Sequence, residues 1–204
     1  MTRALGAALL GMALLPAVAA AKRADVFDVR LETSKGPILI EVHREWAPLG
    51  ADCFRELVRR HYYDDTRVFR VVAGRWAQFG IHGDPRVSAR WRGRTIPDDP
   101  PRVPNARGAV AFAFAVPHGR TTQVFISLAD NTSLDAQGFA PFGRVTSGMD
   151  VADALESTYG EAAGGGIRAG RQEPLFAGGN AYLDREFPRL DRILRAAVIR
   201  SAAR

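Results

Sequence analysis

An arginine and a glutamine, Arg70 and Gln78, lie eight positions apart in a segment whose pattern predicts a β-hairpin. Residues 68–85 give a strand, a turn at Ala73-Gly74, a second strand and a glycine-rich exit. With the turn at that point, positions 70 and 78 are close to mirror-related, so both side chains can project from one face of a sheet. A fixed guanidinium beside a neutral amide suits binding and polarising an uncharged carbonyl. It does not suit hydrolysis, which requires a nucleophile or a metal ion.

Three blocks of the chain resemble segments of the cyclophilin-type peptidyl-prolyl cis-trans isomerases. The first is the hairpin segment, which carries its Arg and Gln at the family's places. The second is the strand Thr-Thr-Gln-Val-Phe-Ile at 121–126, and the third is Leu-Asp-Ala-Gln-Gly-Phe-Ala-Pro-Phe-Gly-Arg-Val at 134–145. The blocks follow in the family's order and spacing. With a weaker start at 33–38, the resemblance covers roughly residues 26–156.

This resemblance implies a mainly β fold, a closed eight-stranded antiparallel β-barrel capped by two α-helices. Because such a barrel is filled by its own side chains, the substrate groove is expected on its outer face. The implied activity is isomerisation of X-Pro bonds in protein substrates, so the expected partners are proline-containing polypeptides. No cofactor and no metal ion are expected.

The resemblance also implies roles for individual residues. Arg70 is expected to be the catalytic residue, because a rigid, permanently charged guanidinium can favour the twisted amide. Gln78 and Gln123 are expected to hold the peptide backbone. The remaining expected substrate-binding residues are apolar and line the proline pocket: Phe112, Phe125, Leu134 and Phe139, with Trp76 adding apolar surface.

The chain departs from the family pattern at several of these places. Arg75 stands where an aromatic residue usually walls the pocket, and Phe114 where an Asn often binds the substrate backbone. Ser133 replaces a bulky aromatic residue, and Phe139 replaces a frequent His. These departures favour an alternative function, a proline-segment binding module or holdase chaperone with weak or no catalysis. The retained Arg70 favours catalysis.

The rest of the sequence predicts the elements that position these residues. Alternating apolar residues indicate strands at 26–33 and 38–42, and short apolar runs indicate strands at 108–114, 123–128 and 142–146. A strand within 191–199 is expected to seal the barrel.

Helical spacing of apolar residues predicts helices at about 47–61 and 148–157, and a short helix at 180–187. Residues 84–107 contain five prolines and are expected to form a long surface loop. The glycine-rich residues 159–179 are expected to form a flexible loop.

The first 21 residues have the pattern of a secretory signal peptide. Arg3 precedes an apolar stretch that is too short to span a membrane comfortably, and small residues follow it at cleavage spacing. We therefore expect a leader at 1–21 and one isomerase domain at 22–204, exported to the periplasm or secreted. After cleavage the protein is expected to be a monomer without a membrane anchor.

Composition reduces the number of possible partners and functions further. The formal net charge is +6, but the basic residues are dispersed without a block of like charges, so no nucleic-acid partner is expected. A basic protein that binds anionic polymers would need a clustered basic face, which the sequence does not show. The single cysteine, Cys53, permits no intrachain disulfide and is expected to be a small buried hydrophobic residue. The four histidines lie on separate segments without ligand spacing.

Overall fold

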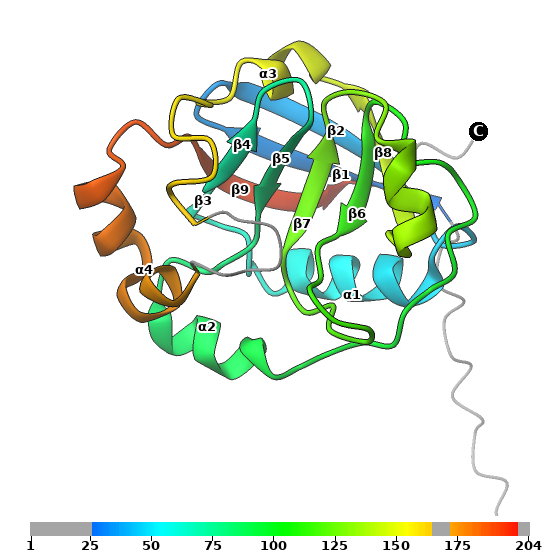
Figure 1. Cartoon of the computed structure of the whole chain (residues 1–204), viewed down its shortest axis with the longest axis horizontal. Coiled ribbons are helices and arrows are strands. Elements are labelled where there is room, and N and C mark those ends of the chain that lie inside the picture. Colours follow the sequence, from blue (N-terminus) through cyan, green and yellow to red (C-terminus); the bar gives the residue numbers. More distant parts are fainter. Residues whose placement is uncertain (1–25, 165–171, 200–204) are drawn as a thin grey trace, which may run out of the picture.

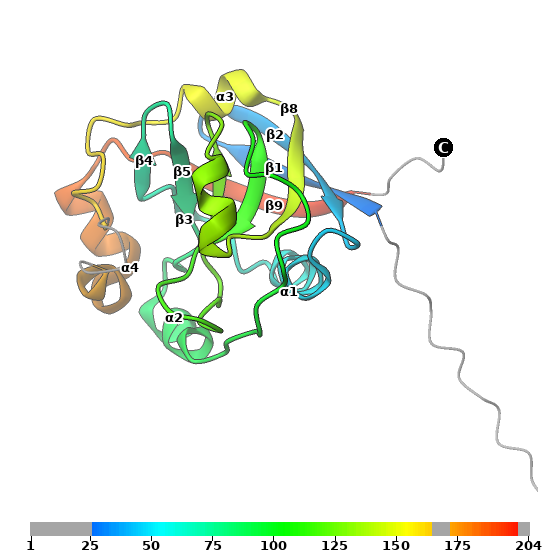
Figure 2. The same ribbon diagram turned by 45° about the vertical axis from the view of Figure 1, so that its right-hand side comes forward.

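The computed structural model describes residues 26–164 and 172–199. Its centre is one strongly curled antiparallel sheet with the strand order β3-β9-β1-β2-β8-β6-β7-β5-β4, which Figures 1 and 2 show from two directions. The strands are β1 (Val26–Thr33), β2 (Gly36–His43), β3 (Thr66–Arg67), β4 (Arg70–Val72), β5 (Trp76–Phe79), β6 (Ala109–Phe112), β7 (Val124–Ser127), β8 (Pro141–Ser147) and β9 (Arg192–Ile199). The helices are α1 (Pro48–Arg59), α2 (Pro85–Arg92), the 3-10 helix η1 (Thr132–Gln137), α3 (Met149–Asp153) and α4 (Glu173–Glu186).

The expected mainly β fold with helices is confirmed, but the described residues do not show a closed eight-stranded barrel. The described residues form a nine-stranded half-barrel whose two end strands, β3 and β4, do not pair with each other. These strands are successive pieces of one chain segment, separated only by Val68 and Phe69, so they cannot lie side by side. The predicted C-terminal strand is confirmed as β9, which pairs with β1 and β3.

Two helices lie at opposite ends of the curled sheet, as expected (Figure 1). α1 starts with Pro48 in its first turn and buries Phe54, Leu57 and Val58 against the sheet. α3 is shorter than predicted and ends at Asp153. No helix in the described part of the chain combines the length and the apolar character needed to span a bilayer.

The predicted hairpin is confirmed with its register. β4 and β5 pair with Arg70 directly opposite Gln78, and Gly74 makes the turn with a φ of 67°. Because directly opposed residues of an antiparallel pair share a face, the guanidinium and the amide project on the same side. β5 also pairs with β7, which places Phe125 opposite Gln78.

Alternation along the strands separates the interior from the outer face. On β6, Phe112 packs into the main core, whereas Ala111 points to the other side. On β7, Ile126 joins the core, and Phe125 lies on the outer side opposite Ala111. Phe125 and Trp76 belong to a separate apolar cluster there. This cluster forms the apolar wall of the site described below.

Two stretches predicted as loops contain helices. α2 lies within residues 84–107, where the side chain of Asp84 accepts a hydrogen bond from the backbone of Arg86 and caps the helix. α4 begins at Glu173, inside the glycine-rich stretch, and breaks at Gly179 with a φ of 55°. A Cβ on Gly179 would lie 2.0 Å from the carbonyl oxygen of Gly83, so only glycine allows this close approach.

The segment that carries α4 packs beside the β4–β5 edge of the sheet (Figure 2). Its side chains Leu175, Leu183 and Leu190 form a second apolar cluster with Phe69 and Ile81, which flank the β4–β5 hairpin. This packing holds the two described parts of the segment 157–190, residues 157–164 and 172–190, close to the hairpin. Residues 1–21, the predicted leader, lie outside the described residues.

Candidate functional site

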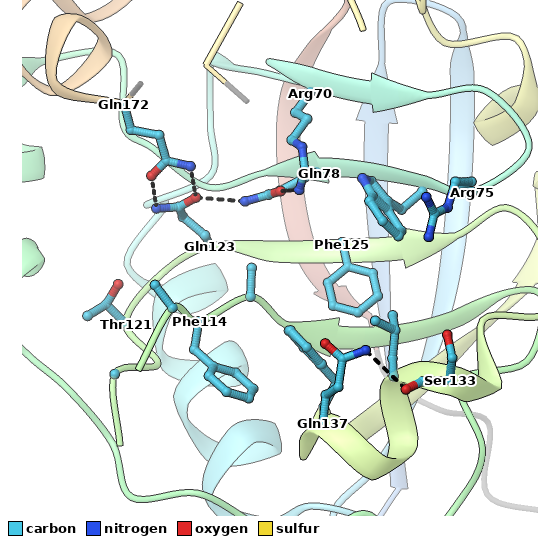
Figure 3. A pocket seen from close by; sticks show the side chains of 16 residues that line it. Arg70, Arg75, Gln78, Phe114, Thr121, Gln123, Phe125, Ser133, Gln137 and Gln172 are labelled. Atoms are coloured by element: carbon cyan, nitrogen blue, oxygen red, sulfur yellow. Dashed lines mark hydrogen bonds between the residues drawn. The ribbon is translucent and has the colours of Figure 1, made fainter. Parts of the chain in front are cut away.

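A pocket of about 450 Å³ lies on the outer face of the sheet over β5, β6 and β7 (Figure 3). This volume is within the range of small-ligand sites. Its lining comes from the β4–β5 hairpin, the loop after β6, β7, the η1 region and the residue before α4. The lining residues are Arg70, Arg75, Trp76, Gln78, Ala113, Phe114, Ala115, Gly119, Thr121, Gln123, Phe125, Ser133, Leu134, Gln137, Phe139 and Gln172.

Hydrogen bonds join four of these side chains into one row along a wall of the pocket. Arg70 donates from Nη1 to Oε1 of Gln78 over 2.9 Å, and Gln78 donates from Nε2 to Oε1 of Gln123 over 2.8 Å. Gln123 and Gln172 then exchange two amide hydrogen bonds of 2.8 and 3.0 Å. We call Arg70, Gln78, Gln123 and Gln172 the polar row (Figure 3). Its first three members are the polar site residues expected from the sequence.

The guanidinium of Arg70 is held from several sides. Besides the bond to Gln78, its Nη2 pairs with Oε1 of Glu161, and its Cζ lies 5.0 Å from the ring centroid of Trp76. The Arg70 side chain is only 11% exposed, so little water competes for these contacts. Each terminal nitrogen carries two N–H groups and uses one in these bonds, which leaves one donor on each for a bound ligand.

The opposite side of the pocket is apolar. Trp76, Phe125 and Leu134 are buried in one cluster, and Phe139 packs against it. The rings of Phe125 and Phe139 meet edge to face with centroids 5.7 Å apart, and Phe114 stacks on Phe139 at 4.4 Å. A rigid aromatic wall of this kind fits a compact apolar ring.

The structure places Phe112 elsewhere than the sequence analysis expected. Its side chain is 1% exposed and belongs to the main core, where its ring lies 5.3 Å from that of Phe142. Phe112 follows Ala111 in β6, and Ala111 shares the outer face with Phe125, so Phe112 must point inward. Ala113, the next residue with outward parity, lines the pocket instead.

The residues that depart from the family pattern also lie at the pocket. Arg75 is exposed, and its Cζ lies 4.4 Å from the ring centroid of Trp76. The indole ring therefore has the guanidinium groups of both Arg70 and Arg75 within cation–π range. Phe114 extends the aromatic wall, whereas the small side chain of Ser133 adds no aromatic ring to its part of the pocket. Arg70 and Arg75 are the charged residues among the described lining.

Cys53 lies behind the pocket rather than in it. Its thiol donates a weak hydrogen bond of 3.6 Å to the carbonyl of Thr121. Burial raises the pKa of the Cys53 thiol to about 11, so the side chain stays protonated at neutral pH. A thiol in this state is a poor nucleophile. Cys53 packs against the main core but is only partly buried, less than the sequence analysis expected.

The chemistry of the lining is that of binding and polarisation. The described residues around the pocket include the hydroxyls of Thr121 and Ser133 but no histidine, carboxylate or thiol that could serve as a base. Within residues 26–164 and 172–199, no group of three or more His, Cys, Asp or Glu is placed to hold a metal ion. What the pocket offers is an apolar wall facing a row of amide and guanidinium donors.

Two residues at the ends of the hydrogen-bonded chain, the row member Gln172 and the Arg70 partner Glu161, were not identified from the sequence. Gln172 lines the pocket and is 5% exposed, and Glu161 pairs with Arg70 from outside. Both belong to the stretch predicted as a flexible loop. Their contacts span 49 and 91 positions of the chain, and no periodicity or motif connects residues so far apart.

Comparison with known sequences agrees with this geometry. The chain matches the family described as "Cyclophilin type peptidyl-prolyl cis-trans isomerase/CLD" over residues 28–170. It is 33% identical over 142 residues to the peptidyl-prolyl cis-trans isomerase of Acinetobacter baylyi, which covers 65% of this chain and 75% of that protein. A peptidyl-prolyl cis-trans isomerase of Arabidopsis thaliana is 35% identical over 136 residues, covering 64% of this chain and 80% of its own.

Solved structures show the same fold. The cyclophilin-type peptidyl-prolyl cis-trans isomerase of Cryptosporidium parvum superposes with a TM-score of 0.62 at 18% identity, over 87% of this chain and 99% of that one. Cyclophilin AquaCyp293 from Hirschia baltica gives a TM-score of 0.58 at 19% identity, over 86% and 75% of the two chains. The sequence match and the fold agree with each other, and we conclude that this chain belongs to the cyclophilin-type peptidyl-prolyl cis-trans isomerases.

Proposed function

We propose that this isomerase acts on X-Pro bonds of exported polypeptides and assists their folding, with Arg70 as its catalytic residue. The proline ring enters the apolar side of the pocket, between Trp76, Phe125 and Phe139. Gln78 and Gln123 hold the peptide backbone on the other side. We also propose that the protein acts as a monomer.

The reaction needs only an environment that favours a twisted amide. Rotation about a peptide bond has a barrier of about 18–20 kcal/mol, because the nitrogen lone pair is delocalised into the carbonyl. When the bond twists, the lone pair becomes localised on the prolyl nitrogen and can accept a hydrogen bond. A donor fixed in that direction binds the twisted state more tightly than either planar isomer, and this difference in binding is catalysis.

The placement of the Arg70 guanidinium is the observation that carries this proposal. It lies at the boundary between the polar row and the aromatic wall, beside Trp76 and bonded to Gln78. A proline ring against the wall would present its nitrogen toward this boundary. The guanidinium acts as a hydrogen-bond donor and keeps a free N–H on each terminal nitrogen, so no proton transfer is required.

The proposed location outside the cytoplasm is supported by residues 1–21, whose charge and apolar pattern are those of a cleaved leader. Export predicts a mature N-terminus near Ala20–Lys22. N-terminal sequencing of protein from the exported fraction tests this prediction. Recovery of an intact Met1, or of cytoplasmic protein only, would contradict export without affecting the isomerase.

The experiment for the whole proposal is an isomerisation assay on a set of X-Pro peptides. Uncatalysed exchange takes tens to hundreds of seconds, so catalysis is visible as line broadening or exchange peaks in NMR spectra of the peptide. We expect faster exchange with the wild type and faster refolding of an exported protein whose folding is limited by proline isomerisation. A protein that bound these peptides without accelerating exchange would instead be the binding module or holdase.

A further inference from the structure

Residues of the segment 157–190 lie at both ends of the polar row. At one end, Glu161 pairs with Arg70, and at the other, Gln172 pairs with Gln123. The β4–β5 hairpin supplies Arg70 and Gln78, and Gln123 directly precedes β7. The segment 157–190 therefore reaches the site at two separate points, and at each point it contacts a residue that the proposed function uses.

Glu161 restricts the direction of the Arg70 guanidinium. Gln78 binds Nη1 and Glu161 binds Nη2, so the plane of the group is fixed at two atoms. The carboxylate of Glu161 is 46% exposed, and water therefore screens much of its charge. The geometric restraint persists because it depends on a directional hydrogen bond, which is strongest when both partners are ionised. The net effect of Glu161 is to aim the free donors of Arg70.

Gln172 restricts the amide of Gln123 in the same way. The Oε1 atom of Gln123 accepts bonds from Gln78 and Gln172, which use both of its lone pairs. Its Nε2 donates one hydrogen to Gln172 over 2.8 Å and keeps the second. The amide of Gln123 therefore cannot rotate without breaking three hydrogen bonds. The remaining N–H is presented in one direction, as a donor for a peptide carbonyl.

We propose that Glu161 and Gln172 are positioning residues of the isomerase, Glu161 acting through Arg70 and Gln172 acting through Gln123. Because Arg70 is assigned to the twisted state, loss of Glu161 should lower kcat and leave KM nearly unchanged. Because Gln123 is assigned to the planar, bound substrate, loss of Gln172 should raise KM and leave kcat nearly unchanged. The inference rests on the proposed roles of Arg70 and Gln123.

The test compares Glu161→Gln and Gln172→Ala with the wild type in steady-state isomerisation of one X-Pro peptide. We expect kcat to fall about twofold to tenfold in Glu161→Gln, and KM to rise about twofold to tenfold in Gln172→Ala, as the release of one fixed side chain would cause. Glu186→Gln is the matched control. Glu186 is 44% exposed, pairs with Arg185 and lies on the same segment away from the pocket, so both constants should stay at wild-type values.

A second pair of variants tests whether Gln172 acts through Gln123. In a Gln123→Ala background, Gln172→Ala should give no further rise in KM, because its partner is already gone. A further rise would mean that Gln172 binds the peptide itself and would overturn its positioning role. An unchanged or higher kcat in Glu161→Gln would overturn the role of Glu161. A carboxylate that merely competes with substrate for the Arg70 donors would raise activity, rather than lower it, when it is lost.

The outcomes also separate this inference from the proposed function. If Arg70→Ala abolishes turnover while Glu161→Gln and Gln172→Ala behave as the wild type, the catalytic assignment stands and the positioning roles fail. If Arg70→Ala keeps wild-type turnover, the catalytic assignment itself fails. Melting temperatures of all variants show whether a kinetic change comes from loss of the folded state.

Discussion

Replacing Arg70 with alanine tests the catalytic assignment most directly. The substitution removes the charged donor at the junction of polar row and aromatic wall, with its bonds to Gln78 and Glu161. Loss of one preorganised donor to a transition state costs about 2.7–4 kcal/mol, or about 10²–10³ in rate. We expect kcat/KM for X-Pro peptides to fall by this factor. Peptide binding should persist in part, because Phe125 and Gln123 remain.

The same structure gives the expected loss of stability. Gln78 is 4% exposed, so its Oε1 would lose its donor in a place that water reaches poorly, at about 1–3 kcal/mol. The half-exposed partner Glu161 adds at most about 1 kcal/mol. We therefore expect a measurable fall in the melting temperature but a folded protein at 25 °C, since native domains are stable by about 5–15 kcal/mol. Activity should be compared at a temperature where both proteins are folded.

Two further variants separate chemistry from packing. Arg70→Lys keeps a positive donor near Gln78 and should recover stability, yet remain poorly active because an ammonium on a flexible stem does not reproduce the planar fork. Arg92→Ala is the matched control. Arg92 binds Glu173 through two bonds of 3.2 and 2.7 Å and lies 4.2 Å from the ring of Phe176, outside the pocket. Turnover by Arg70→Ala within threefold of the wild type, with normal folding, would refute the assignment.

Other predictions concern the pocket wall and two partly buried groups, Cys53 and His82. Arg75→Phe should lower KM for small proline peptides roughly threefold or more, if half of an aromatic side chain's burial energy reaches the ligand; an unchanged KM would mean that Trp76 already supplies the wall. Alkylation of Cys53 at pH 8 should be roughly a hundredfold slower in the native protein than in denaturant, because burial raises its pKa to about 11. Burial lowers the pKa of His82, so the unfolded chain binds more protons. The free energy of unfolding should therefore fall as the pH drops below about 6.5, and denaturant titrations of His82→Gln should show a weaker dependence.

Local patterns in the sequence predicted the hairpin that carries Arg70 and Gln78, because the position of its short turn, residues 73–75, fixes the register. Gly74 defines the turn, and the pairing of Arg70 with Gln78 follows by counting outward. The closure of the sheet could not be predicted in this way. It depends on the pairing of β3 with β9, which lies near the other end of the chain, and β3 has only two residues. Sequence patterns give the faces of strands more reliably than the pairing of distant edges.

The misplacement of Phe112 has a similar cause. An apolar residue next to alanines in a short strand can face either side, since the run Ala109–Phe112 is buried throughout and shows no alternation. The pairing of Ala111 with Phe125 decides the face, and this pairing joins strands separated by a loop of eleven residues, 113–123. Once that register is known, Ala111 and Ala113 must be outward and Phe112 inward. Small residues at those two positions then leave room for the pocket.

The segment 157–190 explains why this groove differs from one built by the sheet alone. A hairpin and the residue before β7 can place a guanidinium and two amides in a row, but on an exposed surface these long side chains sample many rotamers. Glu161 and Gln172 close the row at both ends, and the apolar cluster around Leu175 and Leu183 holds the segment in place. The side-chain conformational entropy of the row is therefore lost during folding, so little more is lost when substrate binds. This arrangement would allow catalysis to persist where Arg75 and Ser133 leave one side of the pocket without its usual aromatic cover.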